Sequence, residues 1–236
     1  MTKVLAINGS ARMEKGYTKR LLNAFLEGMK EAGAAIELVY AKRLKIRPCL
    51  GDFQCWFEKV GECIQADDMQ DLYVKLRESD IFVLAIPVYL PLPGEIQNLL
   101  NRLMPIVEPV LEFRDGRTRA RFHDDVRISK IVLVSVGGWW EKENMDSVVR
   151  IVEGIAKDVG VEFSGPVIRP HAFVMDREKD KSEEILDAAR RAGAQLVREG
   201  RMSAETLDII SQPLVSEEDL RDEYNKMYRK AKGTTH

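Results

Sequence analysis

Hydroxyl, guanidinium and small side chains gather in the segment 8–18, directly after the apolar run 4–7. Ser10 and Thr18 place hydroxyls toward the two ends of this loop, with Arg12, Gly16 and Tyr17 between them. A helix beginning here would add free backbone N–H groups, and all of these groups favour an anion. The loop lacks the GxGxxG and GKS or GKT patterns of nucleotide sites. It therefore indicates a phosphate monoester, and the alternative is an ordinary strand-to-helix turn capped by Thr18.

A second candidate loop follows the apolar run 81–86 and contains three prolines in the segment 87–94. Such a stiff loop can hold its backbone polar groups against a flat heteroaromatic ring, and Tyr89 offers a stacking face. The alternative is a stiffened turn with a core tyrosine. The candidate ligand-binding residues are Pro87, Val88, Tyr89 and Leu90.

A third loop, after the apolar run 130–136, begins Gly137, Gly138, Trp139, Trp140. Paired glycines let a ligand approach the backbone closely, and their N–H groups could meet the pyrimidine edge of a flavin. Trp139 or Trp140 could form a wall of that site. Packing on the C-terminal tail or at a subunit contact is the alternative, especially for Trp140.

The elements that must position these loops alternate along the chain. Apolar runs predict strands at 4–7, 35–40, 81–86, 130–136 and 161–168, and amphipathic patterns predict helices at 18–32, 69–77, 94–103 and 145–159. Near-continuous apolar strands joined by helices imply an α/β fold, with a doubly wound parallel sheet covered on both faces. Ligands bind beyond the carboxyl ends of such strands, so the three loops should converge on one site.

Composition limits the function classes. The chain has 236 residues, 45% hydrophobic and 31% charged, with a net charge of −2, which predicts one main core and neither a disordered chain nor a nucleic-acid-binding surface. No apolar run is long enough to cross a bilayer and no signal-peptide pattern is visible, so a cytoplasmic protein with no membrane partner is expected.

Two segments lie outside the minimal core. Residues 105–127 predict an inserted hairpin or an extended loop, and helical patterns follow at 181–200, 204–210 and 216–230. The expected organisation is a single domain over 1–200, with this insertion, and a helical C-terminal extension over 201–236 that could lie at a subunit interface.

Three segments of the sequence together resemble a known family: NGSAR…GYT, PCLGDFQCW…GEC…DDM and PVY…PGEIQNLLNR. They are similar to the NAD(P)H-dependent FMN reductases and the related iron–sulfur flavoproteins, over roughly residues 3–170. The resemblance implies a flavodoxin-like five-stranded sheet of order 2-1-3-4-5, with FMN as cofactor. It places the FMN phosphate at Ser10, Arg12, Tyr17 and Thr18 and the ring at Pro87, Val88 and Tyr89, and it matches Gly137 and Gly138 more loosely.

The cysteines depart from that pattern. Iron–sulfur relatives bind a [4Fe–4S] cluster with a CxxCxxC run and a fourth cysteine, whereas the register here is Cys49, Asp52, Cys55, Cys63. A carboxylate is a poorer ligand than a thiolate for such a cluster. We therefore expect no stable [4Fe–4S] cluster and no metal site. The alternative is a cluster with Asp52 or an outside ligand in the remaining position.

The expected function is an FMN-dependent oxidoreductase. It would pass electrons from NADH or NADPH through bound FMN to a quinone, a flavin, another small acceptor or a redox protein, without a catalytic acid–base residue. One alternative is an electron-transfer flavoprotein, with or without an iron–sulfur cluster, that acts between protein partners without direct reduction by NAD(P)H. Another is a flavin-free regulatory or scaffold protein. A homodimer or homotetramer is expected from the family.

Overall fold

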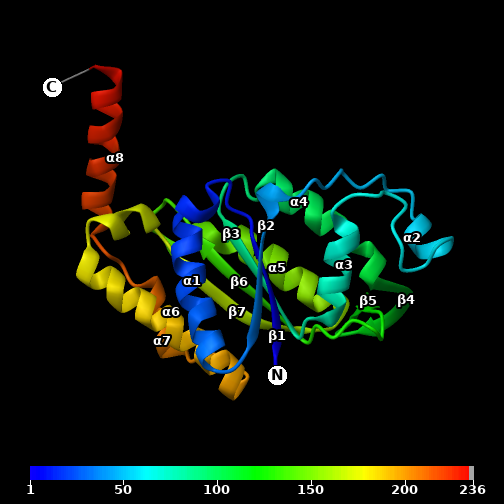
Figure 1. Ribbon diagram of the computed structural model, residues 1–236. Helices are drawn as coiled ribbons and strands as arrows, with labels where there is room; N and C mark the ends of the chain where they lie inside the picture. The colour runs from blue at the N-terminus through cyan, green and yellow to red at the C-terminus, as the bar shows by residue number, and fades with distance from the viewer. Residues whose placement is uncertain (234–236) are drawn as a thin grey trace.

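Short apolar runs form one parallel sheet in a computed structural model, which describes residues 1–233 (Figure 1). Residues 234–236, the end of the expected extension 201–236, lie outside the described part. The strands of this sheet are β1 (Lys3–Asn8), β2 (Ala35–Tyr40), β3 (Ile81–Pro87), β6 (Lys130–Val136) and β7 (Glu162–Arg169). Their order is β2-β1-β3-β6-β7, which confirms the predicted 2-1-3-4-5 order because an inserted hairpin takes the labels β4 and β5.

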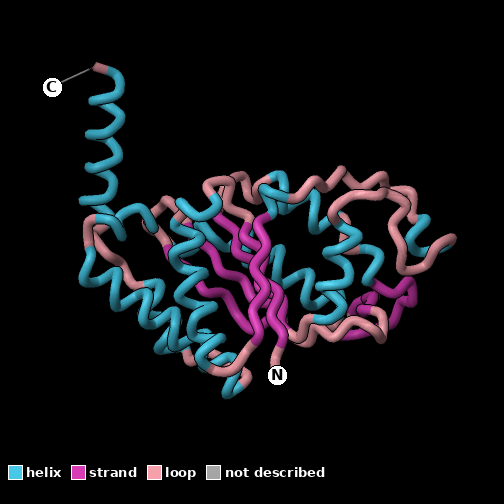
Figure 2. Tube along the Cα trace, viewed as in Figure 1, coloured by secondary structure: helices cyan, strands magenta, loops and turns pink. Residues whose placement is uncertain are grey.

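Helices cover both faces of this sheet, as the tube in Figure 2 shows. One face is covered by α1 (Tyr17–Glu31), α6 (Lys179–Glu199) and α7 (Ala204–Ser211). The other is covered by α3 (Met69–Glu78), α4 (Gly94–Asn101) and α5 (Asp146–Val159). The remaining helices are α2 (Gln54–Phe57) and α8 (Glu217–Lys232). Short 3-10 turns are η1 (Met13–Lys15), η2 (Ala41–Arg43), η3 (Met104–Ile106), η4 (Lys142–Met145) and η5 (Ala172–Asp176).

Burial on both faces explains why the strands are apolar throughout. Along β1, Val4 and Ala6 belong to the layer beneath α1 and α6, whereas Leu5 and Ile7 belong to the layer beneath α3 and α4. Successive side chains of a strand point to opposite faces, so a strand covered on both sides needs an apolar residue at every position.

Helices α1 and α6 approach each other through two glycines. A Cβ on Gly28 would lie 1.8 Å from the carbonyl oxygen of Arg190, and a Cβ on Gly193 would lie 2.0 Å from that of Phe25. No side chain fits at such distances, so the two backbones can pack this closely only where both helices carry glycine. This contact fixes α6 on α1 and builds it into the core.

The insertion forms the hairpin that the sequence allowed. Strands β4 (Val107–Arg114) and β5 (Arg117–Phe122) pair antiparallel, and Asp115 and Gly116 turn the chain with φ of 52° and 75°. Arg119 forms a 3.2 Å ion pair with Asp158 at the end of α5. The hairpin therefore lies against α5, at the other end of the molecule from α8 (Figure 1).

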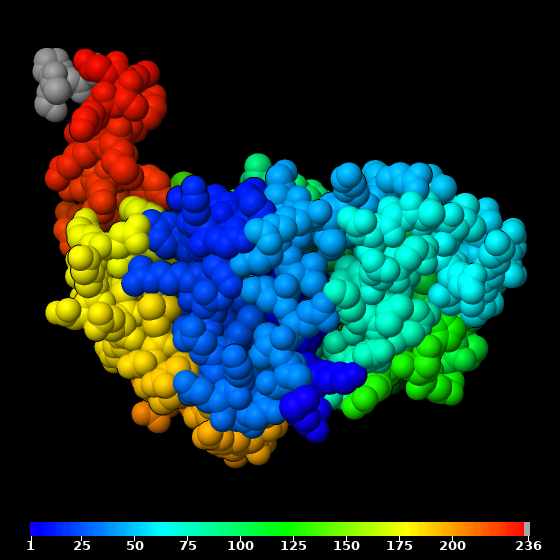
Figure 3. All heavy atoms as spheres, viewed as in Figure 1, coloured from blue at the N-terminus to red at the C-terminus, as the bar shows by residue number. Residues whose placement is uncertain are grey.

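The C-terminal segment begins in the core and ends outside it. Ile210, Leu214 and Leu220 are buried in the layer that contains α1 and α6. Beyond Leu220, α8 projects from the body of the molecule (Figures 1 and 3). Among the helices of residues 1–233, none combines the length and the apolar content that crossing a bilayer would require.

Candidate functional site

The loops after β1, β3 and β6 meet at the carboxyl edge of the sheet and enclose a cavity of 310 Å³. The candidate residues that line it are Ser10, Arg12, Gly16, Tyr17, Thr18, Pro87, Val88, Tyr89, Gly137 and Gly138. Two candidates do not line it: Leu90 is 99% exposed, and Trp139 is 66% exposed and stacks on Tyr224. The loop convergence expected for a doubly wound sheet is thus present.

The first loop is folded tightly onto Ser10. The Ser10 N–H donates to Asn8 Oδ1 at 2.9 Å, and the Arg12 N–H donates to Ser10 Oγ at 3.3 Å. A Cβ on Gly16 would lie only 2.6 Å from Ser10 Oγ. A side chain at position 16 would displace the Ser10 hydroxyl, so the close approach of Gly16 to Ser10 favours glycine and shapes a cradle of backbone groups.

The N-terminus of α1 faces this cradle without a side-chain cap. Gly16 is the N-cap residue, and Thr18 is buried but forms no capping hydrogen bond, so the capped-turn alternative is not what the structure shows. Among the described residues, the N–H groups of Tyr17 and Thr18 have no acceptor and Arg12 has no salt-bridge partner. Unpaired N–H groups at a helix N-terminus beside a free guanidinium form a site for an anion.

Tyr17 contributes differently from the expectation. Its hydroxyl donates to Asp176 of η5, and burial together with this hydrogen bond raises the pKa of Tyr17. The guanidinium carbon of Arg12 lies 5.9 Å from the Tyr17 ring centroid, a cation–π distance. The hydroxyl is therefore occupied within the protein, and Tyr17 offers an anion its backbone N–H and its contact with Arg12.

The loop after β3 is held by its own backbone. The Val88 N–H donates to the Val136 carbonyl at 3.0 Å, and the Tyr89 N–H donates to the Pro91 carbonyl at 2.9 Å. The Tyr89 side chain is half exposed. A fixed loop with an accessible aromatic ring is suited to contact with a flat ligand.

The two glycines after β6 have different roles. The Gly137 N–H donates to the Arg169 carbonyl at 3.0 Å, so only the Gly138 N–H lacks an acceptor among the described residues. A Cβ on Gly138 would lie 3.1 Å from the Tyr224 hydroxyl. Of the two expected ligand donors, only the Gly138 N–H remains. The nearby Tyr224 hydroxyl leaves little room for a side chain at this position.

Five residues that line the cavity were not predicted from the sequence. They are Val136 in β6, Ala172 and Phe173 in η5, and Tyr224 and Met227 in α8. The available signal was the recurrence of Tyr224, Met227 and Tyr228 at helical spacing in an otherwise charged segment. That pattern indicates an apolar stripe on the helix, but it does not indicate which part of the protein the stripe faces.

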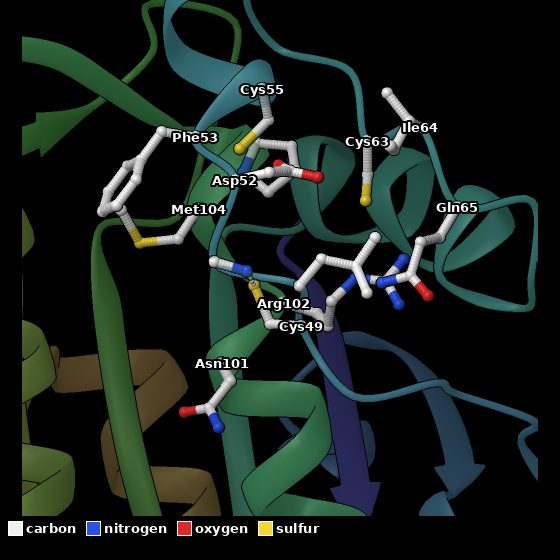
Figure 4. Close-up of a pocket in the computed structure, with 13 residues that line it drawn as sticks. Cys49, Asp52, Phe53, Cys55, Cys63, Ile64, Gln65, Asn101, Arg102 and Met104 are labelled. Carbon is white, nitrogen blue, oxygen red and sulfur yellow. Dashed lines mark hydrogen bonds between the residues drawn. The ribbon is translucent and has the colours of Figure 1, made fainter.

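A second cavity, of 170 Å³, is lined by the cysteine segment and the end of α4 (Figure 4). Cys55 lies beside Asp52 on one side of it, and Cys63 lies on the other. Burial raises the pKa of the Cys55 thiol, and the charges of Cys63 and Cys49 raise it further. The three thiols and Asp52 therefore share one small space.

Beneath this cavity lies a buried ion pair. Arg102 is 1% exposed, and its Nη1 and Nη2 donate to the two carboxylate oxygens of Asp67 at 2.8 and 3.2 Å. Burial alone would raise the pKa of Asp67, but hydrogen bonds from Arg102 and from backbone N–H groups hold it below its ordinary value. This fork-shaped pair braces the segment that carries the cysteines.

The donor set around the second cavity does not match a four-thiolate cluster. Asp52 occupies the second position of the register Cys49, Asp52, Cys55, Cys63, and its Oδ1 already accepts the Gln54 N–H at 3.1 Å. Within residues 1–233, no three His, Cys, Asp or Glu side chains are grouped closely enough to hold a metal ion. We derive no chemistry from a cluster here.

The fold and the site together define a flavodoxin-like protein with an anion cradle beside a stiff aromatic loop. The family model for NADPH-dependent FMN reductases matches residues 2–139, more than half of the chain, and the chain belongs to this family. The match contains the first two loops of the site and ends at Trp139.

Curated relatives include proteins named iron-sulfur flavoprotein. One from Archaeoglobus fulgidus is 35% identical over 104 residues, which is 44% of this chain and 46% of the relative. One from Methanosarcina thermophila is 31% identical over 101 residues, which is 42% of this chain and 51% of the relative. The chain thus spans about half the length of the curated relatives it matches.

Solved structures with the same fold include an FMN-dependent NADH-azoreductase from Bacillus anthracis in complex with FMN. It has a TM-score of 0.60 at 14% identity and covers 84% of this chain and 100% of its own. An NAD(P)H:quinone oxidoreductase from Methanothermobacter marburgensis has a TM-score of 0.55 at 20% identity, with coverage of 83% and 96%. At these identities the likeness concerns the fold.

Proposed function

We propose that the protein binds FMN in the cavity at the carboxyl edge of the sheet and is an NAD(P)H-dependent oxidoreductase. Electrons would pass from a nicotinamide cofactor to a small acceptor such as a quinone or a flavin. The observation that carries this proposal is the convergence of the uncapped α1 N-terminus, the stiff Tyr89 loop and the Gly137–Gly138 turn on one cavity. Membership of the FMN reductase family supports the choice of ligand.

The residues of the cradle fit a phosphate monoester. Arg12 supplies a cation, the N–H groups of Tyr17 and Thr18 supply donors, and Gly16 keeps the space between them free of a side chain. A dianion is stabilised at a helix N-terminus by the helix dipole and by direct hydrogen bonds. These groups would fix one end of FMN.

At the other end of the cavity, protein groups would orient the ring. Pro87 and Val88 form a rigid apolar side, Tyr89 an aromatic side, and the Gly138 N–H a donor for a ring acceptor. Bound FMN supplies the hydride and electron chemistry, so the protein needs to position two flat rings face to face and to limit access of water. No acid–base side chain is required for this role.

An anaerobic titration tests the proposal. Purified protein should bind FMN with quenching of its fluorescence, and addition of NADH or NADPH should bleach the bound flavin at a rate that saturates with the nicotinamide concentration. Absence of FMN binding would refute the flavin site and leave the scaffold alternative. Binding without direct bleaching would instead identify an electron carrier that needs a protein donor.

The proposal also includes a homodimer or homotetramer, because flavin sites of this family often lie near subunit contacts. Sedimentation velocity of the FMN-bound protein tests this part separately. A single species with the mass of one chain would contradict it without affecting the flavin site.

A further inference from the structure

The C-terminal helix α8 reaches the proposed flavin cavity and supplies part of its wall. Tyr224 and Met227, on one side of α8, line the cavity together with Phe173 of η5. The family match ends at residue 139 and therefore does not include α8.

Polar and apolar contacts fix the first turns of α8 in this position. Ser216 caps the helix by accepting the Asp219 N–H at 3.1 Å, and Leu220 is buried in the core. Arg177 Nη1 donates to Glu223 at 2.8 Å, one residue before Tyr224. These contacts within the chain place Tyr224 at the cavity.

Tyr224 belongs to a cluster of aromatic side chains. Its ring stacks on Trp139 with 6.1 Å between centroids and an interplanar angle of 28°. It meets Phe173 edge to face at 5.2 Å, and its hydroxyl donates to the Gly138 carbonyl at 3.3 Å. Aromatic pairs in these geometries attract each other beyond simple burial, so the cluster forms a firm wall.

This wall keeps apolar surface exposed beside the cavity. Trp139, Tyr224 and Met227 are 66%, 38% and 47% exposed, and the facing loop contributes the half-exposed Tyr89. The wall side chains carry no charge, and the neighbouring Glu223 is neutralised by Arg177. Such a surface favours a flat, uncharged aromatic molecule over a hydrated ion.

We infer that Tyr224, supported by Met227, is a specificity-determining residue that holds a planar, uncharged aromatic electron acceptor at the mouth of the flavin cavity. This inference rests on the proposed function. Tyr224 acts by binding the acceptor, and the electron transfer itself remains that of FMN. The cradle of Arg12 and Thr18 lies in the first loop, whereas Tyr224 lies in α8, so FMN affinity and acceptor KM are measured separately.

The test compares Tyr224→Ala, Tyr224→Phe and the matched control Tyr228→Ala in the full chain loaded with FMN. Tyr228 lies one turn further along α8, is 60% exposed and does not line the cavity. Each protein is titrated with FMN, reduced by NAD(P)H without acceptor, and then assayed with 1,4-naphthoquinone and with ferricyanide, a charged acceptor that does not stack.

For Tyr224→Ala we expect the KM for 1,4-naphthoquinone to rise roughly five- to tenfold, because one aromatic contact with the acceptor is lost. The kcat should be preserved. In Tyr224→Ala the KM for ferricyanide should change less than the KM for 1,4-naphthoquinone. In Tyr228→Ala, FMN affinity, the rate of flavin reduction and turnover with ferricyanide should match the wild type. Tyr224→Phe keeps the ring and should retain the wild-type KM, and Tyr228→Ala should also be unchanged.

Several results would overturn the inference. An unchanged naphthoquinone KM in Tyr224→Ala would remove the role, and an equal rise in Tyr228→Ala would assign the effect to helix stability. An equal rise in Tyr224→Phe would assign it to the hydroxyl. Loss of FMN affinity in Tyr224→Ala would make Tyr224 a flavin residue instead. A wild-type protein that fails to bind FMN or to be reduced would refute the proposed function itself.

Discussion

At the scale of single residues, the anion cradle depends on groups that have no partner among residues 1–233. The N–H groups of Tyr17 and Thr18 face the cavity, while the Tyr17 hydroxyl is occupied by Asp176. The side chain of Thr18 is buried and is not used as a cap, and under the proposed function it would bind a phosphate oxygen. This distinguishes Thr18 from Tyr17, although the resemblance assigned both to the phosphate.

Replacement of Thr18 by Ala should weaken FMN binding about tenfold. A hydrogen bond to a charged group contributes roughly 1.5–3 kcal/mol, and a water molecule that binds the phosphate in place of the hydroxyl would recover part of this free energy. The measurement is the Kd from fluorescence quenching, with the circular dichroism spectrum as a check of the fold. Thr118→Ala, in the hairpin strand β5, is the matched control and should bind as the wild type does. Equal affinities for Thr18→Ala and the wild type would remove Thr18 from the site.

At the scale of elements, the cysteine segment combines a loop, the short helix α2 and the end of α4 around one cavity. The register Cys49, Asp52, Cys55, Cys63 is visible in the sequence, but the sequence does not show that Arg102 and Asp67 brace it from below. The Arg102–Asp67 pair and the hydrogen bond from Arg102 to the Arg47 carbonyl hold this segment against the end of α4.

Protein purified anaerobically should contain iron and acid-labile sulfide well below one cluster per chain, because the donor set lacks a fourth thiolate. The matched variant Asp52→Cys completes the four-thiolate pattern and should take up iron and sulfide during reconstitution. Iron and sulfide analysis together with the visible spectrum measures both. A wild-type chain carrying stoichiometric iron and sulfide would contradict the expectation and favour a cluster with Asp52 or an outside ligand.

At the scale of the whole molecule, three contacts attach the C-terminal segment to the edge of the sheet. Arg169 Nη1 donates to the Ile210 carbonyl at 2.8 Å, His171 Nε2 accepts the Leu214 N–H at 3.0 Å, and Trp140 Nε1 donates to the Val215 carbonyl at 2.9 Å. The packing of Trp140 on the tail is thus the alternative that the structure adopts. These contacts set where α8 begins and, with it, the aromatic wall.

This attachment should make stability depend on pH. Burial, together with the charge of Arg169, lowers the pKa of His171 to about 4. The ordinary value is about 6.5, so between these limits the unfolded chain binds a proton that the folded chain does not. The free energy of unfolding should therefore fall as the pH drops through this window, by about 2 kcal/mol between pH 7 and pH 5.

Urea unfolding of the wild type and of His171→Gln at pH 7 and pH 5 measures this contribution. The variant should be less stable at pH 7, and its loss between the two pH values should be smaller than that of the wild type. An identical loss in both proteins would show that other groups carry the pH dependence and that His171 does not.

The sequence alone determined the layered fold and the position of the candidate loops at strand ends, and it left a purely structural role open as the alternative for each loop. Hydrophobic periodicity reports burial directly, so the strands, their helices and their parallel arrangement follow from local patterns in the chain. The hydroxyls, prolines and paired glycines lie next to strand ends, and the order of a doubly wound sheet brings such ends together. Ser10, Thr18 and Tyr89 accordingly lie around one cavity at this edge of the sheet.

Tertiary structure alone decided the contacts between segments far apart in the sequence. Gly28 packs on the backbone of Arg190, the Tyr17 hydroxyl binds Asp176 and the Tyr224 hydroxyl binds the Gly138 carbonyl, and the smallest of these separations along the chain is 86 positions. Local patterns reveal which face of a helix is apolar, but they carry no information about which distant surface that face meets. The cradle could be predicted because its groups are neighbours in the chain, whereas the aromatic wall could not, because only packing brings α8 to it.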